Sequence, residues 1–297
     1  MSVAESGQAT GAVAPRAKKK PFFNGWKSAQ IFWCGLSYVF LLAPLIIVIG
    51  ASFDGGTGGS AISFPPENLT LKWYFEIPGD QFQALGVSIM IATLTAIGSA
   101  LIGIPAALGL VRSNIRGKYL LAALFRAPMQ IPAVVTGLAF LQMYYWFLSL
   151  TGVAINGTFA GLMLGHLFIG IPYVIGAVTA VLQRFDGRLE EAALILGAPP
   201  LRVLMRVTLP VMLPGIYAGC LYAFMVSFAD VPLSIFLTSP GLVTYPVELF
   251  FALENDFTPS ILASSTLVII FSLVMLLSVQ RLIGLDALLK SGGGSGR

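Results

Sequence analysis

The sequence predicts an all-α membrane protein with six transmembrane helices. Three observations indicate this fold class. The chain is 57% hydrophobic and only 10% charged, whereas soluble domains typically carry about 25% charged residues. Its mean hydropathy is +0.87. The charges also cluster between apolar runs, each long enough to cross a bilayer as a helix of about 20 residues.

The apolar runs place the expected spans in order along the chain. Pro128 and Pro132 interrupt the third run, and a segment before the second run carries Trp73 and Tyr74, which favour a short interfacial helix. A short basic turn at 112–118 follows the second span, and a loop with Glu248, Glu254 and Asp256 follows the fifth. The six predicted spans are residues 31–51, 84–111, 119–150, 159–182, 211–237 and 259–280.

The two ends of the chain differ from the apolar middle. Residues 1–30 are polar and basic, and we expect them to be disordered. They do not resemble a cleavable signal peptide, because the apolar run begins late and no cleavage site follows it. Residues 31–284 form one six-helix transmembrane domain. Residues 285–297 are a tail whose last part, SGGGSGR, has the composition of a flexible linker or tag remnant.

The distribution of basic residues predicts the orientation. Of the 17 Lys and Arg residues, only Lys72 lies in a segment assigned outside, and Arg126 lies within a span. Cytoplasmic loops of membrane proteins carry an excess of basic residues. Both termini are therefore expected in the cytoplasm. This pattern also explains the net charge of +4 without a nucleic-acid partner.

The sequence offers no catalytic or metal-binding motif. The glycine-rich run at residues 55–60 lacks the lysine of a phosphate-binding loop. One His and two Cys cannot form the usual metal-ligand sets, and Cys34 and Cys220 lie in apolar runs as packing residues. We therefore expect no enzyme activity, metal or cofactor in this chain.

Residues 188–214 are the longest charged interval between two long apolar runs. Their periodicity predicts a short helix that ends at Gly197, since glycine readily adopts the positive φ of a helix C-terminal cap. Pro199 and Pro200 suit the first turn of a second helix at about 201–207. We expect Leu209-Pro210 to close that helix, giving a bent helical hairpin at the membrane surface.

The spacing in this hairpin resembles the EAA motif of ABC-importer permeases. Glu191-Ala192-Ala193 is followed by three residues, then Gly197, then nine residues and Val207, then Thr208-Leu209-Pro210. Val207 stands where the family usually has Ile. The similarity to type I importer permeases covers residues 31–284 and is closest to the spermidine/putrescine branch. The segments that carry it are 41–53, 128–140, 165–174 and 225–246.

The resemblance implies a type I ABC importer permease fold in a bacterial inner membrane. Residues 188–210 would be the coupling helices that dock on a separate cytoplasmic ATPase, which binds ATP and Mg. The other implied partners are a second permease chain, a second ATPase, a periplasmic binding protein and the surrounding membrane lipid. The implied coupling residues are Arg188, Glu190, Glu191, Ala192, Ala193, Gly197, Leu209 and Pro210. From periodicity alone, an amphipathic helix lying on the membrane is an equal alternative.

Polar and aromatic residues within the spans are candidates for the substrate path, because ionisable groups at membrane depth are commonly functional. Each has a structural alternative. Asp230 could cap a helix break beside Pro232, and His166 favours a packed, hydrogen-bonded role. Arg126 could pair with Asp230 or with an acid of a partner chain, or extend inward to the interface. The aromatic run fits an interfacial belt or an amine cage. The candidates are Ser227, Asp230, Tyr144, Tyr145, Trp146, Arg126 and His166.

The substrate class is less determined than the family. The polyamine branch often has acidic residues where this chain has Ala133 and Ala229. A polyamine or related amine is the first expectation, and an amino-acid-like compound, an opine or a small organic acid is the alternative. An ion-coupled secondary carrier is less favoured, since the sequence shows no inverted repeat.

Overall fold

The computed structural model describes residues 24–56, 64–255 and 258–291. Within these ranges every regular element is a helix, and six helices are long and apolar enough to cross a membrane. The predicted all-α fold with six spans is therefore confirmed. The six are residues 26–51, 79–112, 133–151, 159–182, 200–228 and 259–277.

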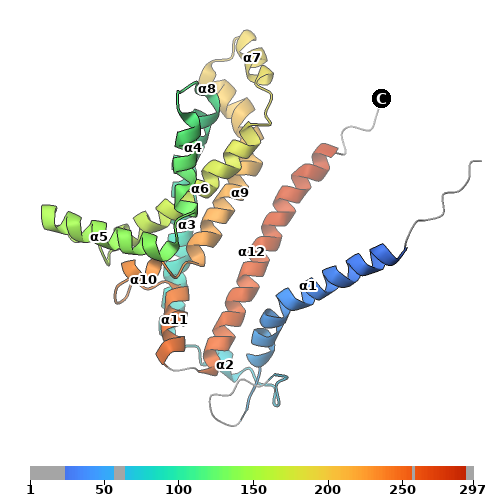
Figure 1. The fold of residues 1–297 in the computed structure, drawn as a ribbon, viewed down its shortest axis with the longest axis vertical. Helices are drawn as coiled ribbons and strands as arrows, with labels where there is room; N and C mark the ends of the chain where they lie inside the picture. The colour runs from blue at the N-terminus through green and yellow to red at the C-terminus, as the bar shows by residue number, and fades with distance from the viewer. Residues whose placement is uncertain (1–23, 57–63, 256–257, 292–297) are drawn as a thin grey trace, which may run out of the picture. The chain divides into compact units, whose positions relative to one another are not determined.

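The chain divides into two units, residues 1–47 and 48–297. The described part of the first unit belongs to α1 (Asn24–Ala51), which contains Pro44. The second unit holds the remaining elements shown in Figure 1. They are α2 (Lys72–Phe75), α3 (Gly79–Arg112), α4 (Lys118–Arg126), η1 (Ala127–Met129), α5 (Ala133–Thr151), α6 (Phe159–Leu182), α7 (Arg188–Ile195), α8 (Pro200–Val203), η2 (Leu204–Thr208), α9 (Leu209–Phe228), α10 (Ser234–Leu237), α11 (Tyr245–Asn255) and α12 (Pro259–Ser291).

The core of the second unit is formed by α3, α6 and α9, which pack against one another (Figure 1). Small residues permit this close approach, as in many membrane helix pairs. A methyl carbon added at Gly219 would lie 2.7 Å from the Cα of Val174, and one added at Gly170 would lie 2.7 Å from Cγ2 of Thr95. The three helices are thus held at backbone contact distance by glycine.

The third predicted span is two helices instead of one. After α4, a single 3-10 turn and the extended Pro132 separate it from α5. Pro132 cannot donate the hydrogen bond that a continuous helix needs, and it disfavours helical backbone at Ile131. Figure 1 shows α5 turned away from the direction of α4. The prediction of one helix over 119–150 was therefore wrong, although its breaking prolines were identified.

The fifth predicted span also ends earlier than expected. Helix α9 stops at Phe228, and α10 begins only at Ser234. The intervening Asp230 and Pro232 lie in the break. The following segment, predicted as a loop with Glu248 and Glu254, contains the helix α11.

The first helix of the charged hairpin forms as predicted, whereas the second helix does not end where the sequence predicted. Helix α8 continues through η2 into α9, so that residues 200–228 form one unbroken helical stretch. Leu209-Pro210 therefore does not close the second helix. Pro210 has no N–H to donate, and the turn before it widens so that the N–H of Leu209 donates to the carbonyl of Leu204.

Candidate functional site

The hairpin begins with α7 and turns sharply at Gly197. This glycine has φ of 84°, which side-chain-bearing residues rarely adopt. Its N–H donates to the carbonyl of Leu194 at 2.9 Å, and the N–H of Ala198 donates to the carbonyl of Ala193 at 3.1 Å. This pair of bonds is a Schellman cap. It ends α7 as the sequence predicted and fixes the angle at which α8 leaves.

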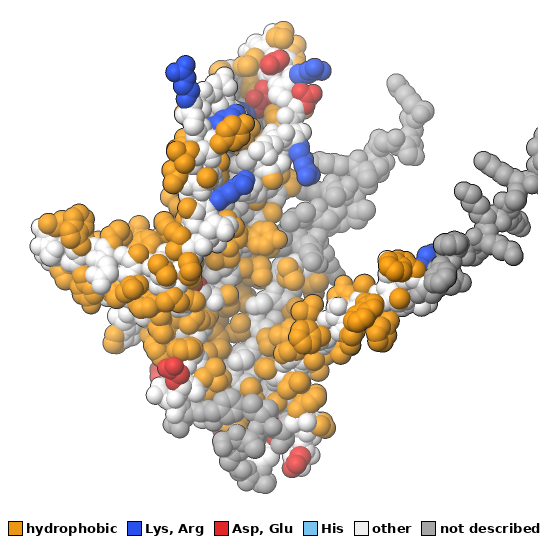
Figure 2. All heavy atoms as spheres, viewed as in Figure 1, with side chains coloured by type: hydrophobic (Ala, Val, Ile, Leu, Met, Phe, Trp, Pro, Cys, Tyr) orange, Lys and Arg blue, Asp and Glu red, His pale blue; other side chains and the backbone are white. Residues whose placement is uncertain are grey.

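The tip of the hairpin presents an exposed surface that is both charged and apolar. Ile195 and Leu196 are 85% and 87% exposed, and Glu191 and Ala192 beside them are exposed as well. Figure 2 shows acidic and basic side chains next to apolar ones over α7 and α8. Large apolar side chains this exposed, rimmed by charge, are typical of a surface that contacts another protein.

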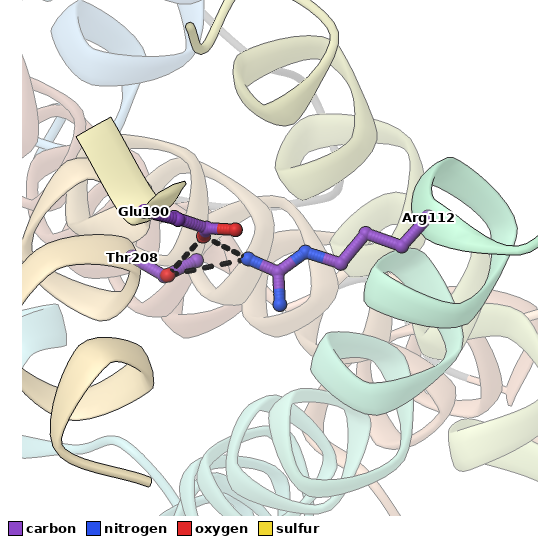
Figure 3. A network of polar contacts seen from close by, with 3 residues as sticks. All are labelled: Arg112, Glu190 and Thr208. Atoms are coloured by element: carbon purple, nitrogen blue, oxygen red, sulfur yellow. Dashed lines mark hydrogen bonds and ion pairs between the residues drawn. The ribbon is translucent and has the colours of Figure 1, made fainter. Parts of the chain in front are cut away.

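A three-residue network joins the hairpin to the membrane helices (Figure 3). Glu190 on α7 accepts hydrogen bonds from Arg112, the last residue of α3, and from Thr208, which immediately precedes α9. The Arg112 guanidinium also donates to the Thr208 hydroxyl at 3.2 Å. The side chains of Arg112 and Glu190 are 41% and 20% exposed, so water screens the pair only in part.

Sequence reasoning named Glu190 as a coupling residue and missed its two partners. Arg112 was assigned only to a basic turn, and Thr208 only to the spacing of the motif. No local pattern links residues that are 78 and 18 positions from Glu190. The contact follows from the packing of α3 beside α9.

A second polar cluster is buried between α3, α6, α9 and α10. Asp230 accepts hydrogen bonds from the N–H and the hydroxyl of Ser234, each at 2.8 Å. His166 Nε2 lies 3.1 Å from Ser234 Oγ, and Nδ1 lies 2.8 Å from Ser227 Oγ. Ser227 Oγ in turn lies 3.3 Å from Thr95 Oγ1. Three of the predicted path residues, Asp230, His166 and Ser227, therefore belong to one continuous chain of hydrogen bonds.

The hydrogen bonds of this cluster involve both nitrogens of the imidazole. The Ser234 hydroxyl has one hydrogen and gives it to Asp230, so it accepts from Nε2–H of His166. Nδ1 pairs with the Ser227 hydroxyl, which also donates to Thr95 Oγ1. His166 is fully buried and both ring nitrogens are satisfied, which makes it a packed, hydrogen-bonded histidine.

The remaining predicted path residues lie apart from this cluster. Arg126 has no ion pair within the described part of the chain, so it does not pair with Asp230, and pairing with an acid of a partner chain stays a prediction. Tyr144 is buried and donates its hydroxyl to the carbonyl of Gly161 at 2.7 Å. Tyr145 and Trp146 are exposed on α5. The three aromatic residues therefore do not face one common space in the described structure.

The sequence matches the family described as binding-protein-dependent transport system inner membrane component over residues 99–285. The chain belongs to this family. It is thus a multi-pass inner membrane permease of an ABC importer, and such permeases work together with other subunits of the transporter.

Two curated relatives show how far this permease matches known ones. It is 32% identical over 237 residues to the putrescine transport system permease protein PotI of Escherichia coli K12, covering 79% of this chain and 83% of the relative. It is 30% identical over 245 residues to the spermidine/putrescine transport system permease protein PotC of the same organism, covering 82% and 89%.

A solved structure confirms the fold of the permease. The match is a chain of a bacterial ABC transporter that imports the acidic polysaccharide alginate, with a TM-score of 0.65 at 17% identity. It covers 89% of this chain and 99% of that chain. At this identity the similarity concerns the fold alone, and the predicted type I permease fold is confirmed.

Proposed function

We propose that this permease forms half of an ATP-driven import path for a small cationic amine of the putrescine or spermidine class. The observation that carries the ATP-driven part is the joining of the exposed hairpin to α3 and α9 through Arg112, Glu190 and Thr208. A docking surface connected in this way moves two core helices whenever its partner moves.

The hairpin provides the contact with a cytoplasmic ATPase that holds ATP and Mg. Glu191 offers a carboxylate for a charge-assisted bond, and Ala192 and Ala193 let a partner surface approach closely. Arg188 and Gly197 set the start and the end of α7. Closure of the ATPase pair then displaces α7, and the displacement reaches the membrane through the Glu190 network and the continuous helix through Leu209-Pro210.

The complete transporter contains more chains than this one. A second permease of different sequence completes the path, two ATPases bind inside, and a periplasmic protein delivers substrate to outer segments near residues 64–80 and 243–255. Both termini lie in the cytoplasm. This orientation follows from the position of the basic residues and matches the family's arrangement of the coupling hairpin.

An acidic cavity supports the amine substrate. It measures about 320 Å³ and is lined at the ends of α3 and α11 by Asp80 and Glu248, together with Gln83. On the proposed orientation it opens outward, where a diamine would arrive. Asp230 is the acidic group placed deeper in the same bundle. These carboxylates and the two amine-transporting relatives favour a cation.

A second substrate class has its own support. Ala133 and Ala229 lack the acidic groups common in the polyamine branch, and Arg126 lines a cavity of its own. These features favour an amino-acid-like compound, an opine or a small organic acid. Identifying which molecule the cognate binding protein carries separates the two classes.

Uptake measured in intact cells, which retain the periplasmic binding protein, tests the proposal. We expect vanadate to abolish uptake of labelled putrescine and an uncoupler to leave the initial rate unchanged. Glu191→Lys should lose both the co-purifying ATPase and uptake, whereas Arg116→Glu, a charge reversal at an exposed residue of the turn before α4, should keep both. Uptake that an uncoupler stops and vanadate spares would establish a secondary carrier instead. If organic acids but not amines inhibited uptake through this transporter, the substrate would be an organic acid and the amine class would be wrong.

A further inference from the structure

A cavity of about 220 Å³ lies between α3, α4 and α6, away from the buried polar cluster and from the coupling network. Lys118 and Arg126, at the two ends of α4, both line it, and no Asp or Glu does. The other lining residues are Leu110, Val111, Tyr119, Ala122, Ile175, Gly176, Thr179 and Gln183. The cavity is therefore positively charged on one side and apolar on the other.

The two cations of the cavity have no acidic partner within the described residues, and Lys118 Nζ lies 5.9 Å from the centroid of the Tyr119 ring. Neither Lys118 nor Arg126 has a carboxylate within 4.0 Å there. Thr179 is only 8% exposed, and its buried hydroxyl has no hydrogen-bond partner in that part of the chain. A buried hydroxyl left unpaired costs about 1–3 kcal/mol. Two cations and a free hydroxyl donor together suit an anion with several acceptor oxygens.

The position of α4 indicates where such an anion comes from. Nine residues of helix extend about 13 Å, which is less than half of the ~30 Å hydrocarbon core. Helix α4 starts directly after the basic turn at 113–117. On the orientation of the proposed function, on which this step rests, the cavity lies in the cytoplasmic leaflet. Beside it α4 exposes the apolar side chains Leu120 and Leu124.

We propose that this cavity binds the phosphate group of an anionic phospholipid from the cytoplasmic leaflet. The phosphodiester accepts from Lys118, Arg126 and the Thr179 hydroxyl, and the acyl chains lie along the exposed apolar residues of α4. Basic pockets between transmembrane helices on the cytoplasmic side suit such headgroups. A free phosphate offers the same oxygens but has nothing to place on the apolar side.

Native mass spectrometry of the transporter, purified with its partner subunits, tests this site. The complex is reconstituted into nanodiscs of equal parts phosphatidylethanolamine and phosphatidylglycerol and then extracted. The wild type should retain phosphatidylglycerol. The double variant Lys118→Gln, Arg126→Gln should retain an amount that is lower by a factor of about ten or more. Arg116→Gln, which removes a cation from the adjacent turn outside the cavity, is the matched control and should retain it. Lys118→Arg with Arg126→Lys should also retain it.

Three results would overturn the lipid site. One is equal retention by the wild type and the double glutamine variant. Another is displacement of phosphatidylglycerol from the wild type by inorganic phosphate alone, which would indicate a site for a free anion. The third is efficient cross-linking of Ala122→Cys to the partner permease, which would show that protein covers the cavity. Uptake assayed on the same samples separates this inference from the proposed function, because uptake without retained lipid contradicts the site alone.

Discussion

Glu190 is the residue at which the hairpin contacts α3 and the start of α9. The role of its ion pair with Arg112 can be tested by exchanging the two charges. Arg112→Glu or Glu190→Arg alone places like charges together. We expect each to lower the amount of substrate imported per ATP hydrolysed by about fivefold, corresponding to ~1 kcal/mol for a partly exposed pair. The exchange Arg112→Glu with Glu190→Arg should recover part of the loss.

The control for this exchange is Arg116→Glu, a charge reversal at an exposed residue of the turn between α3 and α4. This reversal should leave import per ATP unchanged. Single variants that transport as efficiently as the wild type would show that the Glu190 network carries no movement.

Asp230 has a structural role in the hydrogen bonds to Ser234 and a proposed role in the substrate path, and two substitutions separate the two. Asp230→Asn keeps an oxygen that accepts from Ser234 and removes the charge, whereas Asp230→Ala leaves the N–H and hydroxyl of Ser234 unpaired. We expect Ala to destabilise the protein by about 1–3 kcal/mol and Asn by much less. If the carboxylate contacts the amine, Asn should still raise the KM of uptake several-fold. Melting temperature and uptake kinetics of both variants provide the measurement.

An unchanged KM in Asp230→Asn would assign Asp230 to structure alone. Tyr145→Phe, on the exposed face of α5, is the neutral comparison for both measurements.

Single residues were predicted best where their chemistry is local. Gly197 was identified as a helix end because a positive φ selects glycine, and His166 was expected to be packed and hydrogen-bonded. The partners of Arg112 were not found, since they lie on helices distant in sequence. The alternative that Asp230 caps a helix break beside Pro232 agrees with its hydrogen bonds to Ser234, although the predicted span 211–237 ran through that break.

At the level of helices, the contact between α6 and α9 depends on a residue without a side chain. Gly219→Val would place carbon atoms within 2.7 Å of the Val174 backbone, and the helices cannot separate without losing their other contacts. We expect a loss of about 1–3 kcal/mol or more, visible as a lower melting temperature and lower membrane yield. Gly86→Ala in α3, where nothing lies within 4 Å, should change neither.

Helix boundaries were predictable where proline and glycine punctuate polar sequence. They were less so in apolar sequence, since a run such as 211–237 reads as one span although Pro232 interrupts it. Helix α11 was missed because Glu248 and Glu254 suggested a solvated loop. Val247 is nevertheless fully buried, so the segment is a helix with one packed side, while Glu254 is exposed and Glu248 lines the acidic cavity.

At the scale of the whole molecule, the expected orientation predicts which loops each side of the membrane can reach. With Cys34→Ser and Cys220→Ser as background, a single Arg116→Cys should react with a membrane-impermeant maleimide only after the inner membrane is opened. A single Glu254→Cys should react in intact spheroplasts. Both positions are exposed in the structure. The reverse pattern would invert the topology and place the hairpin outside.

The fold class was predictable from composition and apolar run length, because the bilayer imposes both. The family was predictable from the spacing of the hairpin. The acidic cavity was not, since Asp80 and Glu248, which line it, are far apart in the sequence. On the proposed function, the path also includes surfaces of a second permease, whose residues this sequence does not contain.

The widened turn at η2 determines the direction in which α8 leaves α9. A turn closed by a bond between Leu209 and Leu204 holds one residue more than a regular α-helical turn. One residue corresponds to a rotation of about 100° around the helix axis. Deleting the exposed Met205 would let the stretch become a uniform helix, yet α8 would then point to a different side of α9. The extra residue therefore sets the direction, around the axis of α9, in which the proposed ATPase-docking surface faces.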